Sequence, residues 1–347
     1  MPPPRSPATI RSEDELLELL TRPTATLTEF VATLPGALVV LGAGGKMGPT
    51  LCALAKRAAD AAGHPLEVTA VSRFSDPEVE AWLGRQGIAT VRADLLDRDA
   101  VQALPDAPDV INLTGLKFGT SQDPGLTWAT NTLAPAHVAE RYAASRIVAL
   151  STGNVYPLVP VSGGGAAEDY PLTPAGEYAN AAVARERIFE FHSRRHGTAI
   201  AIVRLNFAVE LRYGVLVDIG RRVWEGRAVD VTNGWFNCIW QGDANAMIIR
   251  SLGLAATPAT AWNLSCPERR STRAVAEAFG RLFGKVVTLE GSEAPDAFLC
   301  DPSKLCHRLG PPPTPLDPVI EWVAEWIRSG GRLLDKPTRF EVRDGFY

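Results

Sequence analysis

The feature that most constrains the fold is a regular alternation of apolar and amphipathic segments that begins at Ala37. Six short apolar segments recur between longer, helix-like ones: ALVVLGAGG, LEVTAVSRF, IATVRADL, DVINLTGL, RIVALSTGNVY and TAIAIVRLNF. Strands that are continuously apolar and separated by helices lie in a parallel sheet with helices on both faces. The sequence therefore predicts an α/β fold, a doubly wound parallel Rossmann sheet that binds ligands beyond the carboxyl ends of its strands.

The rest of the chain divides around this sheet. Residues 1–35 are expected to form a helical arm, because SEDELLELL carries a capping serine followed three residues later by Glu15. This arm would pack on its own domain or on a partner subunit, which leaves a homodimer possible. Residues 36–206 form the predicted dinucleotide-binding domain, residues 207–330 mainly a smaller substrate lobe interleaved with it, and residues 331–347 a polar tail expected on the surface.

Composition and charge exclude several classes of partner. The 347 residues carry a formal net charge of −4, which gives no electrostatic footprint for nucleic acid or an anionic membrane. No apolar run approaches the roughly 18 residues of a membrane span, and MPPPRSPATI at the N-terminus lacks the apolar core of a signal peptide. The five cysteines, an odd number without a close metal-binding pair, are expected to be reduced. We therefore expect a cytoplasmic protein without a metal site.

The segment LGAGGKMG, which follows the first apolar segment and opens a helix, is the candidate cofactor turn. Gly42, Gly45 and Gly48 keep Gly-x-x-Gly-x-x-Gly spacing. Small residues let the backbone approach a phosphate, and free N–H groups at the helix N-terminus attract negative charge. Glycines of this kind also form tight turns without any ligand. The strand before the turn and the helix after it favour a dinucleotide, contacted by the turn and by Lys46 and Met47 within it.

The residues after the second apolar segment indicate which nicotinamide dinucleotide is bound. An acidic side chain at this position holds the ribose 2′-hydroxyl of NAD, whereas an arginine accommodates the 2′-phosphate of NADP. The sequence has Ser72 and Arg73 here, with no carboxylate before Asp76. NADP(H) is therefore favoured, NAD(H) is possible, and the alternative for Arg73 is a solvated loop side chain.

The fifth apolar segment ends in STGNVY, which contains Thr152, and a helix is expected to open at Tyr178. With the glycine turn, this order of motifs resembles the extended short-chain dehydrogenase/reductase family, the NAD-dependent epimerase/dehydratase group, from Ala37 to Ser329. The resemblance implies cofactor contacts at further positions: Asp94 and Leu95 beside the adenine, Thr114, Gly115 and Lys117 after the fourth strand, Asn131 on a helix, and Tyr178.

The resemblance also implies the chemistry, a hydride transfer to or from nicotinamide. Tyr178 matches the family's catalytic acid or base, and Thr152 matches the residue that hydrogen-bonds the reacting oxygen. With Thr152, the candidate substrate contacts are Asn154, Asn206 and Phe236. The implied function is that of an NAD(P)-dependent oxidoreductase or epimerase.

One departure from the family concerns the catalytic pair. The sequence GEYANAAVARE has Ala182 where the family has a lysine, which binds the nicotinamide ribose and lowers the pKa of the tyrosine. Lys117 is the candidate source of the missing positive charge, and Arg185 is a weaker one. Lys117 would otherwise be a cofactor contact alone. A protein that binds the cofactor without redox turnover, as a sensor or scaffold, is therefore the rival function.

A second departure concerns the substrate. Sugar-nucleotide epimerases have an arginine that holds the nucleotide diphosphate at the position of Phe236, in FNCIWQGD. An aromatic side chain cannot replace that charged clamp. We therefore expect a small polyhydroxylated, carbohydrate-like substrate, a sugar or sugar acid rather than a nucleotide sugar. Trp235, Phe236 and Trp240 would stack on a sugar ring or, alternatively, lie in the core of the lobe.

Overall fold

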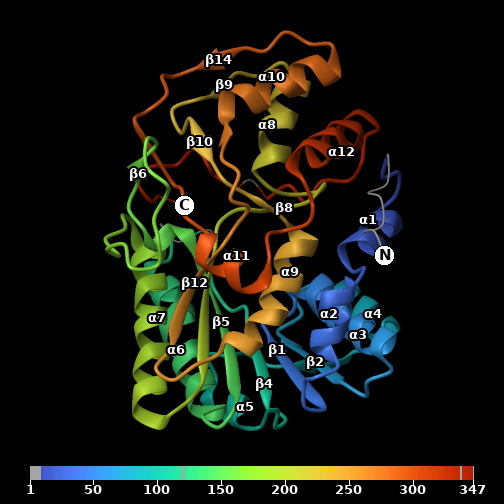
Figure 1. The fold of residues 1–347 in the computed structure, drawn as a ribbon, viewed down its shortest axis with the longest axis vertical. Coiled ribbons are helices and arrows are strands. Elements are labelled where there is room, and N and C mark those ends of the chain that lie inside the picture. The colour runs from blue at the N-terminus through green and yellow to red at the C-terminus, as the bar shows by residue number, and fades with distance from the viewer. Residues whose placement is uncertain (1–8, 118, 120–121, 337, 347) are drawn as a thin grey trace.

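The computed structural model of the chain describes residues 9–117, 119, 122–336 and 338–346. At its centre is a seven-stranded sheet in which neighbouring strands are parallel, in the order β12-β7-β5-β4-β1-β2-β3 (Figure 1). The strands are β1 (Ala37–Leu41), β2 (Glu67–Ser72), β3 (Ala89–Arg92), β4 (Asp109–Asn112), β5 (Arg146–Thr152), β7 (Ile200–Leu205) and β12 (Thr260–Leu264). The predicted doubly wound α/β fold is confirmed.

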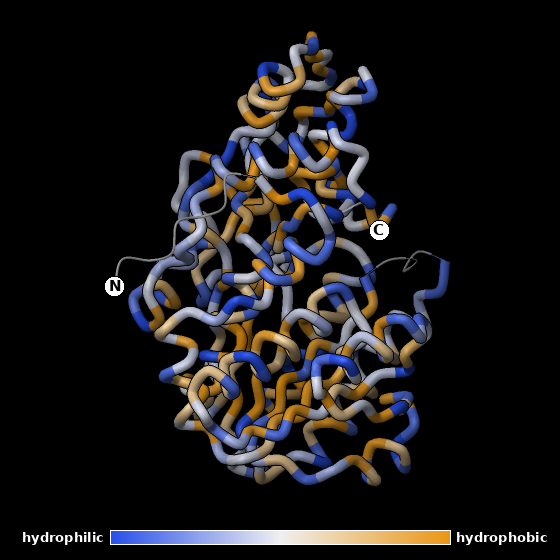
Figure 2. Tube along the Cα trace, turned by 90° about the vertical axis from the view of Figure 1, so that its right-hand side faces the viewer, coloured by the Kyte–Doolittle hydropathy of each residue, from blue (hydrophilic) through white to orange (hydrophobic). Residues whose placement is uncertain are grey.

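Alternation of side chains along the strands builds two separate cores. Leu38 and Val40 of β1 lie in a buried cluster on one face of the sheet, and Val39 and Leu41 lie in a second cluster on the other. Figure 2 shows hydrophobic residues concentrated in these inner strands. Helices cover both faces: α2 (Ala25–Val31), α3 (Gly48–Ala62), α4 (Pro77–Arg85), α9 (Gln241–Arg250) and α11 (Ser303–Leu309) on the first, and α5 (Arg98–Gln102), α6 (Pro124–Arg141) and α7 (Glu177–His196) on the second.

A smaller lobe lies beyond the carboxyl ends of the strands, above the sheet in Figure 1. Its core contains apolar side chains from three helices, among them two buried tryptophans of the last one. The helices are α8 (Val215–Trp224), α10 (Thr272–Phe283) and α12 (Leu316–Arg328). Short strand pairs complete the lobe and its connection to the sheet: β9 (Val229–Asp230) with β14 (Leu289–Glu290), β10 (Trp235–Phe236) with β13 (Arg270–Ser271), β6 (Val159–Pro160) with β15 (Asp296–Ala297), and β8 (Ala208–Val209) with β11 (Ile239–Trp240).

The N-terminal arm packs on its own chain. The hydroxyl of Ser12 accepts a hydrogen bond from the Glu15 nitrogen (3.2 Å) and caps α1 (Glu13–Leu20). Leu16 of α1 enters the lobe core, and α2 packs against α3. Arg57 of α3 forms an ion pair with the arm. Of the two alternatives for the arm, the structure therefore shows packing on the same chain, where it connects the lobe to the sheet domain.

Most of the described tail residues are exposed or half-buried, as expected for a tail on the surface, but three of them are buried. Thr338 and Phe340 are each 3% exposed, and Gly345 is buried. The Phe340 ring belongs to the lobe core. This one aromatic side chain, which the polar composition of the segment does not predict, anchors the tail to the lobe.

Candidate cofactor and substrate site

The glycine turn lies at the carboxyl end of β1, between this strand and α3. Gly42 has a φ of +77°, which favours glycine, and a Cβ there would lie 3.1 Å from the Thr114 nitrogen. A Cβ at Gly48 would lie 2.4 Å from the carbonyl oxygen of Ala43. Helix α3 begins at Gly48, after Met47, without a side-chain cap, so its first N–H groups are left for a ligand. The turn has the shape and the donors that a pyrophosphate needs.

Buried polar atoms lie at the carboxyl end of β4, next to this turn. Asn112 is fully buried and pairs in register with Leu41, the last residue of β1. Within the described part of the chain, neither the Asn112 amide nor the Thr114 hydroxyl has a hydrogen-bond partner. Buried polar groups are nearly always hydrogen-bonded, so such atoms indicate a polar ligand. Their position fits a dinucleotide bound across the ends of β1 and β4.

Arg185 and Asn131 hold the loop that follows β4. Nη1 of Arg185 donates to the Thr114 carbonyl oxygen (3.0 Å) and to Oδ1 of Asn131 (2.9 Å). Nδ2 of Asn131 donates in turn to the Leu116 carbonyl oxygen (3.1 Å). Gly115 allows this approach, since a Cβ there would lie 2.6 Å from Nη1 of Arg185. The Asn131 amide is thus engaged within the protein, and its expected contact with the cofactor stays a prediction. The Arg185 guanidinium holds the loop.

The expected ribose-binding position lies at the end of β2. Ser72 is its last residue, and its hydroxyl oxygen would lie 2.7 Å from a Cβ at Gly44. Arg73 is exposed, and no hydrogen bond or ion pair joins its side chain to another described residue. The nearest carboxylate, Asp76, caps α4 by accepting a hydrogen bond from the Glu78 nitrogen (3.0 Å). The Arg73 guanidinium is therefore available to a ligand.

Asp94 and Leu95, which were expected to border the adenine, follow the end of β3. Asp94 is exposed, and its Oδ1 accepts a hydrogen bond from the Leu96 nitrogen (3.0 Å). Leu95 is 7% exposed and belongs to the core on the α6 face of the sheet. The pair thus presents one polar and one apolar side chain, as a border of the adenine would require.

The Thr–Tyr pair lies at the carboxyl edge of the same sheet. Thr152 ends β5 and begins the 3₁₀ turn η1 (Gly153–Val155). Its hydroxyl accepts a hydrogen bond from the Asn154 nitrogen (3.2 Å) and donates to Oδ1 of Asn154 (3.1 Å). Tyr178 is the second residue of α7, which packs against η1, and is 7% exposed. Strand β5 and helix α7 therefore bring the two candidate catalytic residues to one end of the sheet.

Ala182, one turn after Tyr178, is fully buried in an apolar cluster. The cluster also contains Val155, Tyr156 and Cys300. An ammonium group in such surroundings would be desolvated without a partner. Ala182, which the sequence resemblance places at the family's lysine position, is therefore part of a small hydrophobic core.

A buried network of polar residues lies beneath this cluster. Arg204 of β7 pairs with Glu186 of α7 (2.7 Å), and both side chains are nearly inaccessible. Nη1 of Arg204 donates to the Tyr156 hydroxyl (2.7 Å), which donates to Oδ1 of Asn263 (2.7 Å). Burial raises the pKa of Tyr156 to about 12, so its hydroxyl remains a neutral donor. The network holds α7 against β7 and β12. It thereby fixes the position of Tyr178, which lies on α7, relative to the sheet.

Two lysines come from the sheet domain and meet the lobe. The Lys46 ammonium lies 3.4 Å from the centroid of the Tyr213 ring. Burial, and after it the charges of Lys117 and Lys336, lowers the pKa of Lys46 to about 7. Burial lowers the pKa of Lys117 to about 8, against the opposing charge of Asp218. Both lysines are therefore partly deprotonated near neutral pH, and an anionic ligand would favour their protonated forms.

The residues of the substrate side correct two expectations. Asn206 lies at the base of the lobe, 4% exposed, and its Nδ2 donates to Oδ1 of Asn237 (2.8 Å). Phe236 is fully buried, with its ring centroid 6.4 Å from that of Phe340. Trp240 is also buried, against Trp322. Phe236 and Trp240 are therefore core residues of the lobe, and the predicted aromatic surface for a sugar ring is not formed.

Three residues at this site were not expected from the sequence: Tyr213, Asp218 and Thr338. Burial mainly raises the pKa of Tyr213, and the nearby Asp218 and Tyr178 add to the increase. Asp218 accepts a hydrogen bond from the Thr338 nitrogen (2.8 Å), and burial raises the pKa of its carboxyl group. The one signal available beforehand was a lone carboxylate within the apolar run GVLVDIG.

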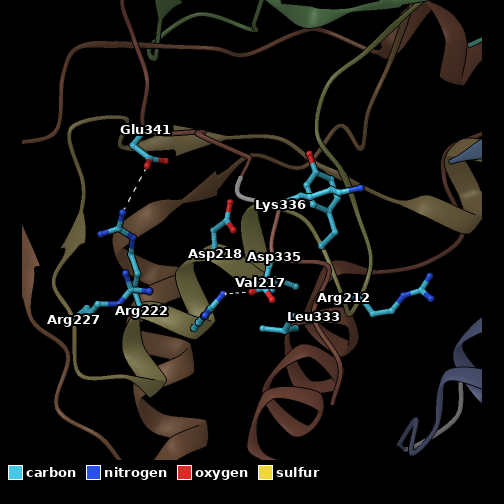
Figure 3. A pocket seen from close by; sticks show the side chains of 11 residues that line it. Arg212, Val217, Asp218, Arg222, Arg227, Leu333, Asp335, Lys336 and Glu341 are labelled. Atoms are coloured by element: carbon cyan, nitrogen blue, oxygen red, sulfur yellow. Dashed lines mark hydrogen bonds and ion pairs between the residues drawn. The ribbon is translucent and has the colours of Figure 1, made fainter. Parts of the chain in front are cut away.

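Tyr213 and Asp218 also line a pocket of about 270 Å³ between α8 and the tail (Figure 3). Its walls carry charges of both signs, and two ion pairs cross it, Arg221 with Asp335 (2.8 Å) and Arg222 with Glu341 (3.6 Å). We call the region where the ends of β1, β4 and β5 meet α8 and the tail the junction.

Comparison with known proteins adds the family. Residues 38–209 match the model described as the NAD dependent epimerase/dehydratase family. This part of the chain, just under half of its length, is similar to that family. It contains the glycine turn, Thr152 and Tyr178 and ends where the lobe begins. The match supports the predicted family over these residues, and with it an NAD-dependent enzyme.

Solved structures of UDP-sugar 4-epimerases share the fold. A UDP-glucose 4-epimerase of Thermus thermophilus in complex with NAD is 21% identical with a TM-score of 0.69, covering 84% of this chain and 99% of that chain. A UDP-glucose 4-epimerase of Thermotoga maritima is 17% identical (TM-score 0.70, 85% and 99% covered). A UDP-glucuronic acid 4-epimerase of Bacillus cereus is 16% identical (TM-score 0.71, 84% and 99% covered). The alignments leave parts of this chain without a counterpart. A sequence search of curated proteins finds no match.

Two further features concern the described residues alone. None of their helices combines the length and the apolarity that crossing a membrane requires. Their His, Cys, Asp and Glu side chains form no group of three or more that could hold a metal ion.

Proposed function

We propose that the protein is an NAD(P)-dependent oxidoreductase or epimerase that acts on a small sugar or sugar acid. One observation carries the proposal: the cofactor turn and the Thr–Tyr pair lie at the same carboxyl edge of the sheet. Gly42 follows β1, Thr152 ends β5, and Tyr178 opens the helix that packs against the end of β5. Ligands of open parallel sheets bind along this edge.

The residues divide into those that would hold the cofactor and those that would act on the substrate. Backbone N–H groups of the glycine turn and of α3 would bind the pyrophosphate, and the Thr114 hydroxyl would bind a neighbouring polar group. The nicotinamide would supply the hydride acceptor or donor at the substrate carbon. Tyr178 would give or take the proton of the reacting hydroxyl, while Thr152 hydrogen-bonds the same oxygen. Lys117 would supply positive charge in place of the lysine absent at Ala182.

For the cofactor we propose a preference for NADP(H) over NAD(H). Arg73 is exposed at the end of β2 without a partner among the described residues, and Asp76 is engaged as a helix cap. A guanidinium binds a phosphate through charge-assisted hydrogen bonds, whereas no free carboxylate is supplied for a ribose diol.

For the substrate we propose that it carries no nucleotide, in contrast to the named neighbours, of which the Thermotoga enzyme was solved with UDP-glucose. Phe236 stands at the clamp position and is buried against Phe340. Arg221 and Arg222 of α8, which could otherwise bind a diphosphate, are paired with Asp335 and Glu341. Calorimetric titration with UDP-glucose should show no binding in the micromolar range, and micromolar affinity would overturn this part of the proposal.

The experiment that tests the function has two stages. The nucleotide that co-purifies with the protein is first identified by mass spectrometry, which decides between NAD and NADP. Sugars and sugar acids are then screened for turnover by the absorbance of reduced nicotinamide, with Tyr178→Phe as the control. Turnover that disappears in the control supports the proposal, and turnover that survives it contradicts the assigned role.

A second candidate is a protein that binds the cofactor without redox turnover. The full burial of Ala182 in an apolar cluster favours it, because that position offers no site for the family's cation. Such a protein would bind the dinucleotide and give no turnover with any carbohydrate in the screen.

A further inference from the structure

We propose that the C-terminal tail is a strap that closes the junction over Tyr178 and opens as a unit to admit the substrate. The strap comprises residues 331–336 and 338–346. The inference rests on the proposed function, because it concerns access to the same site. The inference adds a moving segment to the proposed site, and the opening of this segment can be measured without any turnover.

Thr338 provides the central observation, because it forms hydrogen bonds with residues on both sides of the junction. Its backbone nitrogen donates to Oδ2 of Asp218 on α8 (2.8 Å), and its hydroxyl donates to the same oxygen. Its carbonyl oxygen accepts a hydrogen bond from the Lys117 ammonium, which follows β4 in the sheet domain (3.5 Å). One residue of the tail therefore connects the lobe to the cofactor-binding sheet edge.

The lobe holds the strap on both sides of Thr338. Before it, the Leu334 nitrogen donates to the Arg212 carbonyl oxygen (3.0 Å), and Asp335 forms the ion pair with Arg221. Figure 3 shows Asp218 of α8 and Asp335 and Lys336 of the strap around the same pocket. After it, the Phe340 carbonyl oxygen accepts a hydrogen bond from Nδ2 of Asn233 (2.7 Å). The strap thus follows the lobe surface that faces the sheet.

The end of the strap reaches the helix that carries the catalytic tyrosine. A Cβ at Gly345 would lie 2.3 Å from the Ala175 carbonyl oxygen, and a Cβ at Gly176 would lie 2.3 Å from the Gly345 carbonyl oxygen. Both glycines have positive φ, 82° and 86°. Two glycines that meet this closely indicate a specific backbone contact, and Gly176 immediately precedes α7. The strap therefore runs from the lobe, past the end of β4, to the residue two positions before Tyr178.

The chemistry of these contacts allows the strap to open without unfolding either core. Its ion pairs with the lobe have partly exposed partners, and such pairs are weak and screened by salt. One ring, that of Phe340, is buried in the lobe core. Segments with few buried apolar contacts open locally, well before the whole molecule unfolds. The Phe340 ring packs near Phe236 in the lobe core.

Amide hydrogen exchange of the full-length protein, read by mass spectrometry, tests the strap. In the unmodified protein we expect residues 332–346 and the facing segments 113–117 and 175–180 to exchange together, at least tenfold faster than β5 and β7. Exchange of the strap only together with the sheet would overturn the proposal, because it would not open as a unit. Exchange of the facing segments independently of the strap would overturn it equally, since they would not be covered.

Point variants sharpen the test and separate it from the catalytic proposal. Thr338→Val removes the hydroxyl bonded to Asp218 and keeps the shape, and Phe340→Ala removes the buried ring. Both should increase exchange in the strap and in the facing segments about tenfold while leaving β5 and β7 unchanged. Arg339→Ala is the matched control, because this neighbouring side chain is exposed. If the strap of Thr338→Val exchanges faster and the facing segments do not, the proposal fails, whatever the turnover of the enzyme.

Discussion

On the cofactor side of the junction, the ends of β1 and β4 carry glycines and buried polar atoms without protein partners among the described residues. On the substrate side, apolar side chains fill the two positions at which the sequence resemblance predicts charged ones. Gly48 and the Thr114 hydroxyl are examples on the cofactor side. The buried Ala182 and Phe236 are examples on the substrate side. The two sides belong to one fold, yet only the first keeps the family pattern.

The difference between the two sides follows from the chemical groups with which each side binds its ligand. A pyrophosphate is bound mainly by backbone N–H groups, which require a tight turn and therefore glycine. A substrate is recognised by side chains, each of which can change without altering the turn. The cofactor side is therefore constrained by backbone geometry, whereas the substrate side can replace a charge by a packed hydrophobic group and a tail.

The largest effect is expected from removing the hydroxyl of Tyr178. Tyr178→Phe should lower kcat by about 10²–10⁴-fold, as the loss of a general acid or base does, and leave dinucleotide affinity within about twofold. Steady-state kinetics and fluorescence titration with the cofactor measure the two quantities. Full activity in this variant would show that the substrate side retains the fold of the family without its mechanism.

Restoring the family's lysine should destabilise the protein instead of improving it. Ala182→Lys places an ammonium in a fully buried apolar cluster, at a cost of about 3 kcal/mol or more. Differential scanning calorimetry would measure this as a Tm lower by roughly 4 °C or more. Ala182→Met, similar in length and uncharged, is the control and should lose distinctly less. A stable and more active Ala182→Lys would mean that the substrate side still has the family's cation site.

The cofactor side is tested by removing the arginine at the end of β2. Arg73→Ala should weaken NADP(H) binding about 10–100-fold, because a charge-assisted phosphate contact is lost, and change NAD(H) binding little. Isothermal titration calorimetry with both nucleotides measures the difference. Arg85→Ala, another exposed arginine of this region, serves as the control. Equal losses for the two nucleotides would refute the NADP preference.

Lys117 lies between the cofactor side and the substrate side. The pH dependence of the reaction rate tests whether its charge assists proton transfer. Its pKa of about 8 in the free protein means that its charge is present below this pH and lost as the pH rises through it. If the charge assists proton transfer, kcat/KM should fall as the pH rises through the pKa of Lys117 in the cofactor complex. This pKa lies above about 8, because the anionic cofactor favours the protonated lysine, and Lys117→Met should remove this limb and lower the plateau about tenfold. The profile is measured at saturating cofactor. A limb that persists in Lys117→Met would leave the residue a cofactor contact alone.

The smallest effect is expected at Lys46. Its pKa of about 7 means that a bound pyrophosphate would draw a proton onto it, so cofactor affinity should fall several-fold between about pH 6.5 and 8.5. Calorimetry at about pH 8 in buffers of different ionisation enthalpy should show proton uptake on binding. The uptake should disappear in Lys46→Met. If the variant takes up protons like the unmodified protein, Lys46 does not meet the phosphates.

Much of the sheet domain could be predicted because its signals are local. The apolar strands predict the parallel sheet, and the order of the glycine turn, Thr152 and Tyr178 predicts the family. The roles of Asn131 and Arg185 could not be predicted, since their bond to each other joins α6 to α7 across 54 residues. The burial of Phe236 against Phe340 likewise depends on a contact between distant segments.

The sequence by itself determined the doubly wound sheet, the position of the cofactor turn and the absence of the lysine at Ala182, because periodicity and spacing are properties of neighbouring residues. Only the tertiary structure decided what surrounds those positions. It buries Ala182 among apolar groups, brings Lys46 onto the Tyr213 ring, and passes a polar tail across the junction. Hydrogen bonds and burial act between atoms that are close in space, and the sequence alone does not state which distant residues will meet.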